Sequence, residues 1–305
     1  MAKQKTSMTG FPDPSLTVRP VPVSSLDLSG KSLAIVGGTD GLGRAFARLA
    51  ASRGARVLVV GRTFRDEGTP NITFMKADLS SMREAARVGR ELDTSLDAVL
   101  FTVGIIAAKT REVTPEGIER DMAISYLSRF AVVRELAPRL ASRLPGKPAP
   151  RMFLMGMPGT GNRGDPNDLN GEKSYESMVV HVNTVAANEA LVLDGKKRYP
   201  HALFFGLNPG LVKTNIRANV FGEGSFKHRF AEALIGLLTP TPEQYAERIL
   251  PLFVAPELEG RSGAMFGKKG QAILPTEGFD EPYVESFMSA SEALLKRALG
   301  GDGGH

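Results

Sequence analysis

Gly37, Gly41 and Gly43 lie where a strand pattern gives way to a helix pattern, at a spacing that can bind phosphate. An apolar run, 32–36, precedes the glycines, and residues 44–50 after them carry apolar side chains at helical spacing. We expect Gly37 to form a tight turn with positive φ, Gly41 to leave no Cβ between backbone and ligand, and Gly43 to let the helix pack close to the strand. The free N–H groups of the first helical turn would then face a pyrophosphate.

Other side chains could hold a charge or move a proton. Arg129 lies one helical turn past Ser125, so both can share the face of a helix that looks into a cleft. Asp165 lies in a loop after a predicted strand, at the sheet edge where ligands bind in open α/β folds. His181 can donate or accept a proton near neutral pH. Structural roles are also open: Arg129 could snorkel, Asp165 could shape a turn, and His181 could belong to a core or an interface.

The rest of the chain supplies the elements that must position these side chains. From Lys31 onward, short apolar runs alternate with longer amphipathic segments. Continuous apolar strands, each followed by a helix, indicate a parallel sheet that is covered on both faces. We therefore expect an α/β fold with one doubly wound parallel sheet, the Rossmann fold. The predicted strands are 31–36, 55–60, 71–76, 97–102, 151–156 and 202–207, and the predicted helices are 42–53, 80–92, 115–141 and 176–198.

One domain is expected over residues 30–298, with extensions at both ends. The proline-containing segment 1–29 predicts an extended or partly disordered arm, and the glycine-rich end 299–305 predicts a flexible tail. Residues 211–240 mix glycines, basic residues and phenylalanines without a clear strand, which is typical of a lid or of disorder. Its phenylalanines imply a sizeable apolar substrate. Beyond it we expect a helix at 242–254, a last strand at 262–274 and a closing helix at 280–298.

Composition narrows the possible functions. The net charge of +5 favours an anionic ligand such as a phosphorylated cofactor, but the basic residues are spread along a chain without tryptophan, so no nucleic-acid partner is expected. The absence of cysteine excludes disulfides and thiol nucleophiles, and the scattered histidines predict no metal site. No apolar run of about 18 residues and no signal-peptide core are present, so we expect a cytoplasmic protein without a membrane span.

A series of motifs follows one another in the order of a known family. The three glycines have the spacing Gly-x-x-x-Gly-x-Gly; Asp78-Leu79 follows the third predicted strand; Leu100-Phe101-Thr102-Val103-Gly104 follows the fourth; and Asn208-Pro209-Gly210-Leu211-Val212-Lys213-Thr214 follows the sixth. Together they resemble the short-chain dehydrogenase/reductase family, and the retinol-dehydrogenase-like branch in particular. The resemblance implies that a nicotinamide cofactor contacts Gly37, Thr39, Asp40, Gly41, Leu42, Arg62, Thr63, Asp78, Leu79, Thr102, Val103, Gly104, Pro209, Gly210, Val212 and Thr214.

The turn after the second predicted strand favours NADP(H) over NAD(H). An acidic residue there would hydrogen-bond the ribose 2′-hydroxyl of NAD and repel a 2′-phosphate. The turn instead has Arg62, which can pair with a 2′-phosphate through two hydrogen bonds, and Thr63, which could add a hydroxyl. Asp66 and Glu67 come later and are expected to face solvent.

The catalytic positions depart from the family that the chain resembles. That family uses Ser, Tyr and Lys, with an Asn in the fourth helix, whereas the fifth predicted strand here ends in Gly156-Met157. Two alignments of the next helix are open. Tyr175 can take the place of the family tyrosine, or Val185-Ala186-Ala187-Asn188 can match the branch's Lys-x-Ala-Asn, which places His181 there; the distance to Pro209 favours the second. The lysine is lost in both, because valine stands in its place, and Ser125 replaces the asparagine.

Three functions remain open. An atypical NADP(H)-dependent reductase could reduce a carbonyl, or an iminium whose positive charge Asp165 would stabilise. Asp165 and Arg129 lie at places similar to those of an Asp and an Arg in a fungal alkaloid branch of the family, which couples imine reduction to Diels–Alder cyclisation. The alternatives are a non-redox cyclase or isomerase and a nucleotide-binding pseudoenzyme. Tyr175, His181, Asp165 and Arg129 are the candidate catalytic residues. By family analogy the fourth and fifth helices would form a homodimer.

Overall fold

One mixed sheet organises the molecule. The computed structural model describes residues 6–141, 148–210, 212 and 239–300. Its eight strands follow the order β3-β2-β1-β4-β5-β6-β7-β8; all neighbours are parallel except β7 and β8, which are antiparallel. The strands are β1 Ser32–Val36, β2 Arg56–Gly61, β3 Ile72–Lys76, β4 Ala98–Phe101, β5 Arg151–Met155, β6 Leu203–Leu207, β7 Met265–Phe266 and β8 Ala272–Ile273. The doubly wound α/β fold is thereby confirmed.

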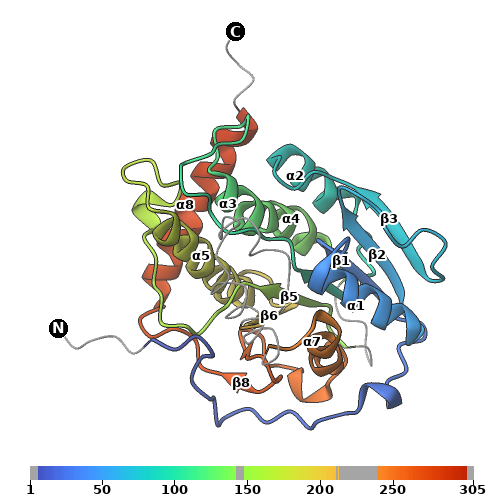
Figure 1. Cartoon of the computed structure of the whole chain (residues 1–305). Helices are drawn as coiled ribbons and strands as arrows, with labels where there is room; N and C mark the ends of the chain where they lie inside the picture. Colours follow the sequence, from blue (N-terminus) through green and yellow to red (C-terminus); the bar gives the residue numbers. More distant parts are fainter. Residues whose placement is uncertain (1–5, 142–147, 211, 213–238, 301–305) are drawn as a thin grey trace, which may run out of the picture.

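Helices cover both faces of the sheet, which explains why the central strands are apolar on both sides. One face carries α2 (Met82–Glu91), α4 (Ser128–Leu136), α5 (Ser177–Arg198) and α8 (Glu281–Gly300); the other carries α1 (Gly41–Ser52) and α7 (Pro242–Ile249) (Figure 1). Each face has its own apolar core. β4 and β5 are buried along their whole length between these cores.

Two predicted elements differ from the structure. The last strand, expected at 262–274, consists of the two short antiparallel strands β7 and β8, because the Gly267–Gly270 turn reverses the chain between them. The helix expected at 115–141 begins only at Arg120. It runs through α3 (Arg120–Met122), a π-helical turn η2 (Ala123–Leu127) and α4, before the 3₁₀ turn η3 (Ala137–Arg139). Such π-helical turns inside helices occur often at functional sites.

The N-terminal arm lies extended against the sheet edge. Pro12 forms a bridge with Ile273 of β8, and the backbone N–H of Leu274 donates to the carbonyl of Phe11. Leu16 and Leu28 are buried in the core that includes α1 and α7, and the arm contains one 3₁₀ turn, η1 (Val23–Ser25). Most of the predicted lid, including all of its phenylalanines, lies outside the described residues.

The C-terminal helix α8 covers the face that family analogy assigned to a homodimer. It packs along α5 and against α2 (Figure 1), and Phe287 is fully buried. Ser291 lies 2.6 Å, hydroxyl to hydroxyl, from Tyr126, and Glu292 pairs with Arg134 of α4 at 2.6 Å. A dimer that pairs α4 and α5 between subunits would therefore have to displace α8. No helix among the described residues is long and apolar enough to cross a membrane.

Candidate active site

The glycine turn brings the backbones of β1, α1 and the β4 end into close contact. Gly37 has a φ of 98°, and a Cβ there would lie 2.4 Å from the backbone nitrogen of Val103. A Cβ at Gly43 would lie 2.4 Å from the carbonyl oxygen of Gly37. Gly41 also has a positive φ, of 48°, and begins α1. Only glycine fits these close approaches, so the local requirements of a phosphate-binding turn are met.

A groove of about 300 Å³ lies over this turn, at the carboxyl ends of β1, β2 and β4. Most of the residues expected to contact the cofactor line it: Gly37, Thr39, Asp40, Gly41, Leu42, Arg62, Asp78, Leu79, Thr102, Val103 and Gly104. Thr63 is exposed and does not line it, and Thr214 lies outside the described residues. The sequence prediction did not include Arg120 and Ile124, which line the groove from α3 and η2. The groove thus lies over the glycine turn and the first turn of α1, whose free N–H groups can bind a phosphate.

Two arginines, Arg62 and Arg120, line the groove together with the carboxyl of Asp78. Arg62 is exposed there, and both Arg62 and Arg120 act on the carboxyl of Asp78. Burial alone would raise the pKa of Asp78, but hydrogen bonds from Ser80 and the charges of the two arginines lower it below its ordinary value. Arg120 also pairs with Glu112, at 2.7 Å.

Asp66 corrects one expectation, because it is buried instead of facing solvent. Its side chain is 3% exposed and accepts hydrogen bonds from Arg44 of α1, at 2.9 Å from Nη2 and 2.9 Å from Nε. Arg48 lies 3.4 Å away. Glu67 is exposed, as expected. The first acid after β2 is thus held by α1 and does not line the groove.

The groove continues into a second cavity, a cleft of about 190 Å³ that shares Leu42, Thr102, Gly104 and Ile105 with it. Apolar side chains dominate its wall, among them Ile106, Met155, Met157, Val185 and Val212. The predicted contacts Pro209, Gly210 and Val212 all line this cleft. Its polar side chains are Thr102, Ser125, Arg129, His181, Thr184 and Asn188; among the described residues no carboxylate lines it.

His181 is held in the cleft by a buried carboxylate. Its Nδ1 lies 2.7 Å from Oδ2 of Asp121, which is fully buried, whereas the His181 side chain is 19% exposed. The other carboxylate oxygen of Asp121 accepts a hydrogen bond of 2.5 Å from the Ser125 hydroxyl. Ser125 in turn accepts from the backbone N–H of Ile105, at 2.9 Å. Because Nδ1 is engaged by Asp121, Nε2 is the ring nitrogen left for a ligand.

The charge of Asp121 keeps His181 basic. Burial lowers the pKa of the imidazole, but the hydrogen bond to Asp121, its negative charge and that of Glu119 outweigh burial and raise the pKa above its ordinary value. At any given pH the imidazolium, which can donate a proton, is therefore more populated than in an ordinary histidine.

Arg129 connects the strand ends that form the cleft. It is 2% exposed; its Nη1 donates to the carbonyl of Met155 at 2.7 Å and to Oδ1 of Asn188 at 2.8 Å, and its Nη2 donates to the carbonyl of Val103. Burial lowers the pKa of the guanidinium to about 9, against the opposing charge of Asp121. These contacts make Arg129 a crosslink between β4, β5 and α5. Its Nε has no hydrogen-bond partner among the described residues.

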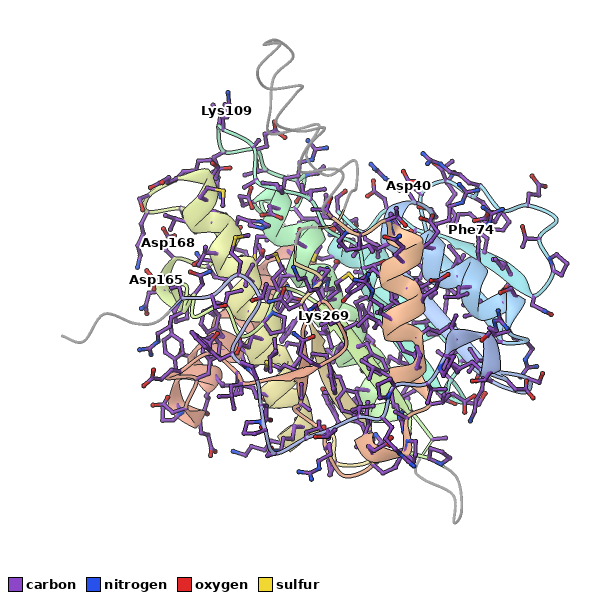
Figure 2. The ribbon with its side chains drawn as sticks, turned by 60° about the horizontal axis from the view of Figure 1, so that its bottom comes forward. Asp40, Phe74, Lys109, Asp165, Asp168 and Lys269 are labelled. Carbon is purple, nitrogen blue, oxygen red and sulfur yellow. The ribbon has the colours of Figure 1, made fainter. Side chains whose placement is uncertain are left out.

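The other two candidates lie outside the cleft lining. The Tyr175 hydroxyl donates to the carbonyl of Ala108 at 2.7 Å, and burial and the charges of nearby carboxylates raise its pKa to about 12. Asp165 is exposed; its carboxylate caps the 3₁₀ turn η4 (Pro166–Asp168) by accepting from the N–H of Asn167 at 2.9 Å. In Figure 2, Asp165 lies beside Asp168 at the rim of the molecule, away from Asp40 at the glycine turn. The structure therefore brings His181 and Arg129 together, without Tyr175 or Asp165.

The end of β5 shows why a hydroxyl is missing there. A Cβ at Gly156 would lie 2.5 Å from Cβ of Asn188, so residue 156 has no room for a side chain while Asn188 stays in place. Asn188 is fixed by its hydrogen bonds to Arg129 and to the carbonyl of Ser125, at 2.8 and 2.9 Å. Met157, the next residue, has a φ of 54°, which is rare for a residue with a side chain. Val185 lines the cleft one turn after His181, so the cleft has an apolar wall at that place.

Asp121 is the functional candidate that sequence reasoning missed. It lies four residues before Ser125, as Ser125 lies four before Arg129. Extending the same helical face by one turn would have found it. The described residues contain no cluster of His, Cys, Asp or Glu that could hold a metal ion.

Comparisons with known proteins agree with this architecture. The sequence profile of the short-chain dehydrogenases matches residues 31–147. An uncharacterised oxidoreductase of Saccharomyces cerevisiae is 46% identical over 293 residues, which cover 94% of this chain and 95% of the yeast protein. Human retinol dehydrogenase 14 is 25% identical over 88% of this chain and 87% of its own length. A putative daunorubicin C-13 ketoreductase from a Streptomyces species is 29% identical over 62% of this chain and 68% of its own length.

Solved structures share the fold at low sequence identity. A short-chain dehydrogenase from Escherichia coli, complexed with NADPH, aligns with a TM-score of 0.58 and 17% identity over 82% of this chain and all of its own. A protein from Mycobacterium paratuberculosis aligns with a TM-score of 0.63 and 18% identity over 91% of this chain and 98% of its own. The glycine turn, the strand order and these relatives lead to one conclusion: the chain belongs to the short-chain dehydrogenase/reductase family.

Proposed function

We propose that this protein is an NADP(H)-dependent reductase of carbonyl groups in which His181 donates the proton. The observation that carries the proposal is the place of His181. It lies in the cleft that continues the nucleotide groove, with Nδ1 paired to Asp121 and Nε2 left for substrate. It also occupies the family's tyrosine position in the alignment that ends in Asn188, whereas Tyr175 lies outside the lining.

The chemistry needs one proton from the protein. When bound, the nicotinamide would supply a hydride to the carbonyl carbon, while the electrons of the carbonyl π bond move to oxygen. His181 donates its Nε2 proton to that oxygen as the alcohol forms, and the neutral imidazole then takes a proton from solvent. Because the pKa of His181 is raised, its acid form is more populated at any given pH than that of an ordinary histidine.

The groove supports NADP(H) over NAD(H). Arg62 lines the groove directly after β2, and Asp66, the first acid after β2, is held by Arg44 and does not line the groove. The NADPH complex of a protein with the same fold is consistent with this choice.

The lining favours a neutral carbonyl over a cation. An iminium would need a carboxylate nearby, and among the described residues none lines the cleft; Asp165 is occupied in capping a turn at the rim. The apolar wall suits a sizeable apolar ketone or aldehyde. The Streptomyces relative named as a putative ketoreductase supports the same class, and we infer that the carbonyl belongs to a secondary metabolite.

The test is turnover of NADPH with a panel of apolar ketones, aldehydes and imines, followed by absorbance and product mass. His181→Phe should lower kcat about 10²- to 10⁴-fold, the usual contribution of a positioned acid, and leave the Kd of NADPH unchanged. His201→Phe is the matched control, because His201 lies outside the cleft lining and contacts the carbonyl of Ala137 at 2.8 Å.

Three outcomes would contradict the proposal. Full activity of His181→Phe would remove His181 as the proton donor. Product without NADPH consumption would select the non-redox cyclase or isomerase. Failure to bind either nucleotide would leave only a scaffold role for the groove.

A further inference from the structure

Asp121, Ser125 and Arg129 place one negative charge, one hydroxyl and one positive charge at four-residue intervals along α3, η2 and α4. All three are buried, with relative exposures of 0%, 6% and 2%. Burial of an ion is costly unless other groups hydrogen-bond it, so a fully buried Asp121 must be matched by its neighbours. His181 and Ser125 supply that match, one at each carboxylate oxygen.

The partner of His181 comes from a different element than the family's lysine does. One turn after His181 on α5, Val185 offers no hydrogen bond and no charge. Asp121, which is buried and lies 60 residues earlier in the chain, contacts the imidazole instead. A positive imidazole beside a negative carboxylate therefore stands where a tyrosine beside a lysine would.

We propose that Asp121 is the positioning residue for His181: it fixes the imidazole with Nε2 toward the cleft and stabilises its charged form, while Ser125 fixes Asp121. The inference rests on the proposed function and adds the group that sets the proton donor's orientation and charge. Asp121 itself touches neither substrate nor cofactor, since it is fully buried behind His181. It acts only through the imidazole.

Burial and the charges around His181 act on its pKa in opposite directions, and the net direction is upward. Asp121 on α3 and Glu119, just before α3, both raise the pKa of the imidazole. Tyr175, ahead of α5, is uncharged near neutral pH because its pKa is about 12. Arg129 on α4 is a positive group nearby, and its hydrogen bonds go to two backbone carbonyls and to Asn188 instead of to Asp121. The carboxylates therefore dominate.

The first test is an NMR titration of the labelled histidine rings in the full chain without nucleotide. His181→Phe identifies the His181 resonance among the four histidines. We expect His181 of the unaltered protein to titrate above the ordinary histidine pKa of about 6.5. Asp121→Asn should lower this pKa by at least about one unit, because it removes the adjacent negative charge.

Asp194→Asn is the matched control. Asp194 is also an acid in a largely buried ion pair, 3.2 Å from Arg134, but it lies outside the cleft lining. It should leave the His181 titration unchanged. A His181 pKa at or below the ordinary value in the unaltered protein, or the same pKa in Asp121→Asn, would overturn the inference; the first measurement decides even if Asp121→Asn fails to fold.

The second test is the pH profile of reduction. Because the imidazolium is the donor, the rate should fall as pH rises through the pKa of His181, and Asp121→Asn should move this fall to lower pH by the shift that NMR measures. At a pH where both proteins hold a charged His181, Asp121→Asn should still lower kcat at least about tenfold, because the ring loses its fixed orientation. Unchanged kcat and an unchanged profile would contradict a positioning role.

The two proposals fail in different ways. If His181 titrates as expected and responds to Asp121→Asn, but His181→Phe keeps full reductase activity, the ion pair stands and the proposed function fails. If His181→Phe is inactive while Asp121→Asn changes neither the titration nor the rate, His181 remains the donor and Asp121 loses its role.

Discussion

The groove over the glycine turn and the cleft that contains His181 are adjacent cavities that share Leu42, Thr102, Gly104 and Ile105, yet they are built in different ways. The groove depends on backbone close to backbone, at Gly37 and Gly43, which leaves few residue types possible. The cleft depends on side chains contributed by α3, η2, α4 and α5. Few residue types fit where backbone lies against backbone, whereas several residue types can donate a proton or orient the residue that does. On our proposal, this difference is why the groove keeps the glycine turn while the cleft has His181 and Asp121 as its proton-transfer pair.

The largest effect on nucleotide binding should come from a substitution that displaces the backbone of the groove. In Gly37→Ala the new Cβ would overlap the backbone of Val103 and occupy a φ that disfavours side chains. We expect the Kd of NADPH, measured by calorimetry, to rise at least about 100-fold. Gly30→Ala separates the strain of a positive φ from the overlap with neighbouring atoms, because Gly30 has a φ of 78° but a Cβ there would have no atom within 4 Å. It should cost about 1 kcal/mol of stability and leave Kd unchanged; equal loss of affinity in both variants would refute the close-contact argument.

A smaller and selective effect should follow where Arg62 lines the groove. Arg62→Ala should weaken NADPH binding about 10- to 100-fold, the range for losing hydrogen bonds to a charged group, and change NADH binding little. Arg87→Ala is a suitable control, because Arg87 pairs with Glu84 and Glu91 on α2, outside the groove lining. Equal weakening of both nucleotides by Arg62→Ala would contradict a role in 2′-phosphate recognition.

The smallest effect on catalysis should come from a substitution of Asp165, which does not line the cleft. Asp165→Ala removes the cap of η4 and should cost about 0.5–2 kcal/mol of stability, while kcat and KM of the reductase stay within about twofold. Thermal melts and steady-state kinetics on the same preparation give both numbers. A tenfold loss of kcat at unchanged KM would return Asp165 to the candidate catalytic residues and revive reduction of an iminium.

Local patterns in the sequence were enough to predict most of the fold. Apolar runs and helical spacing located the strands through β6 and the helices α1, α2 and α5 to within a few residues, because each pattern reflects burial of its own element. The 262–274 prediction was wrong in kind, since those residues form two short strands around a turn. The 115–141 prediction missed the π-helical turn, which periodicity does not signal.

The sequence by itself determined the glycine turn, the lack of a lysine after His181 and the arginine after β2, because each depends on residues that are neighbours in the chain. Only the tertiary structure decided what those residues face. Asp66 is buried against Arg44, and Asp165 is exposed at the rim. Asp121 lies within hydrogen-bond distance of His181, which comes 60 residues later in the chain. The contact between Asp121 and His181 depends on how α3 and η2 pack against α5, and the spacing of residues along one element cannot specify that packing.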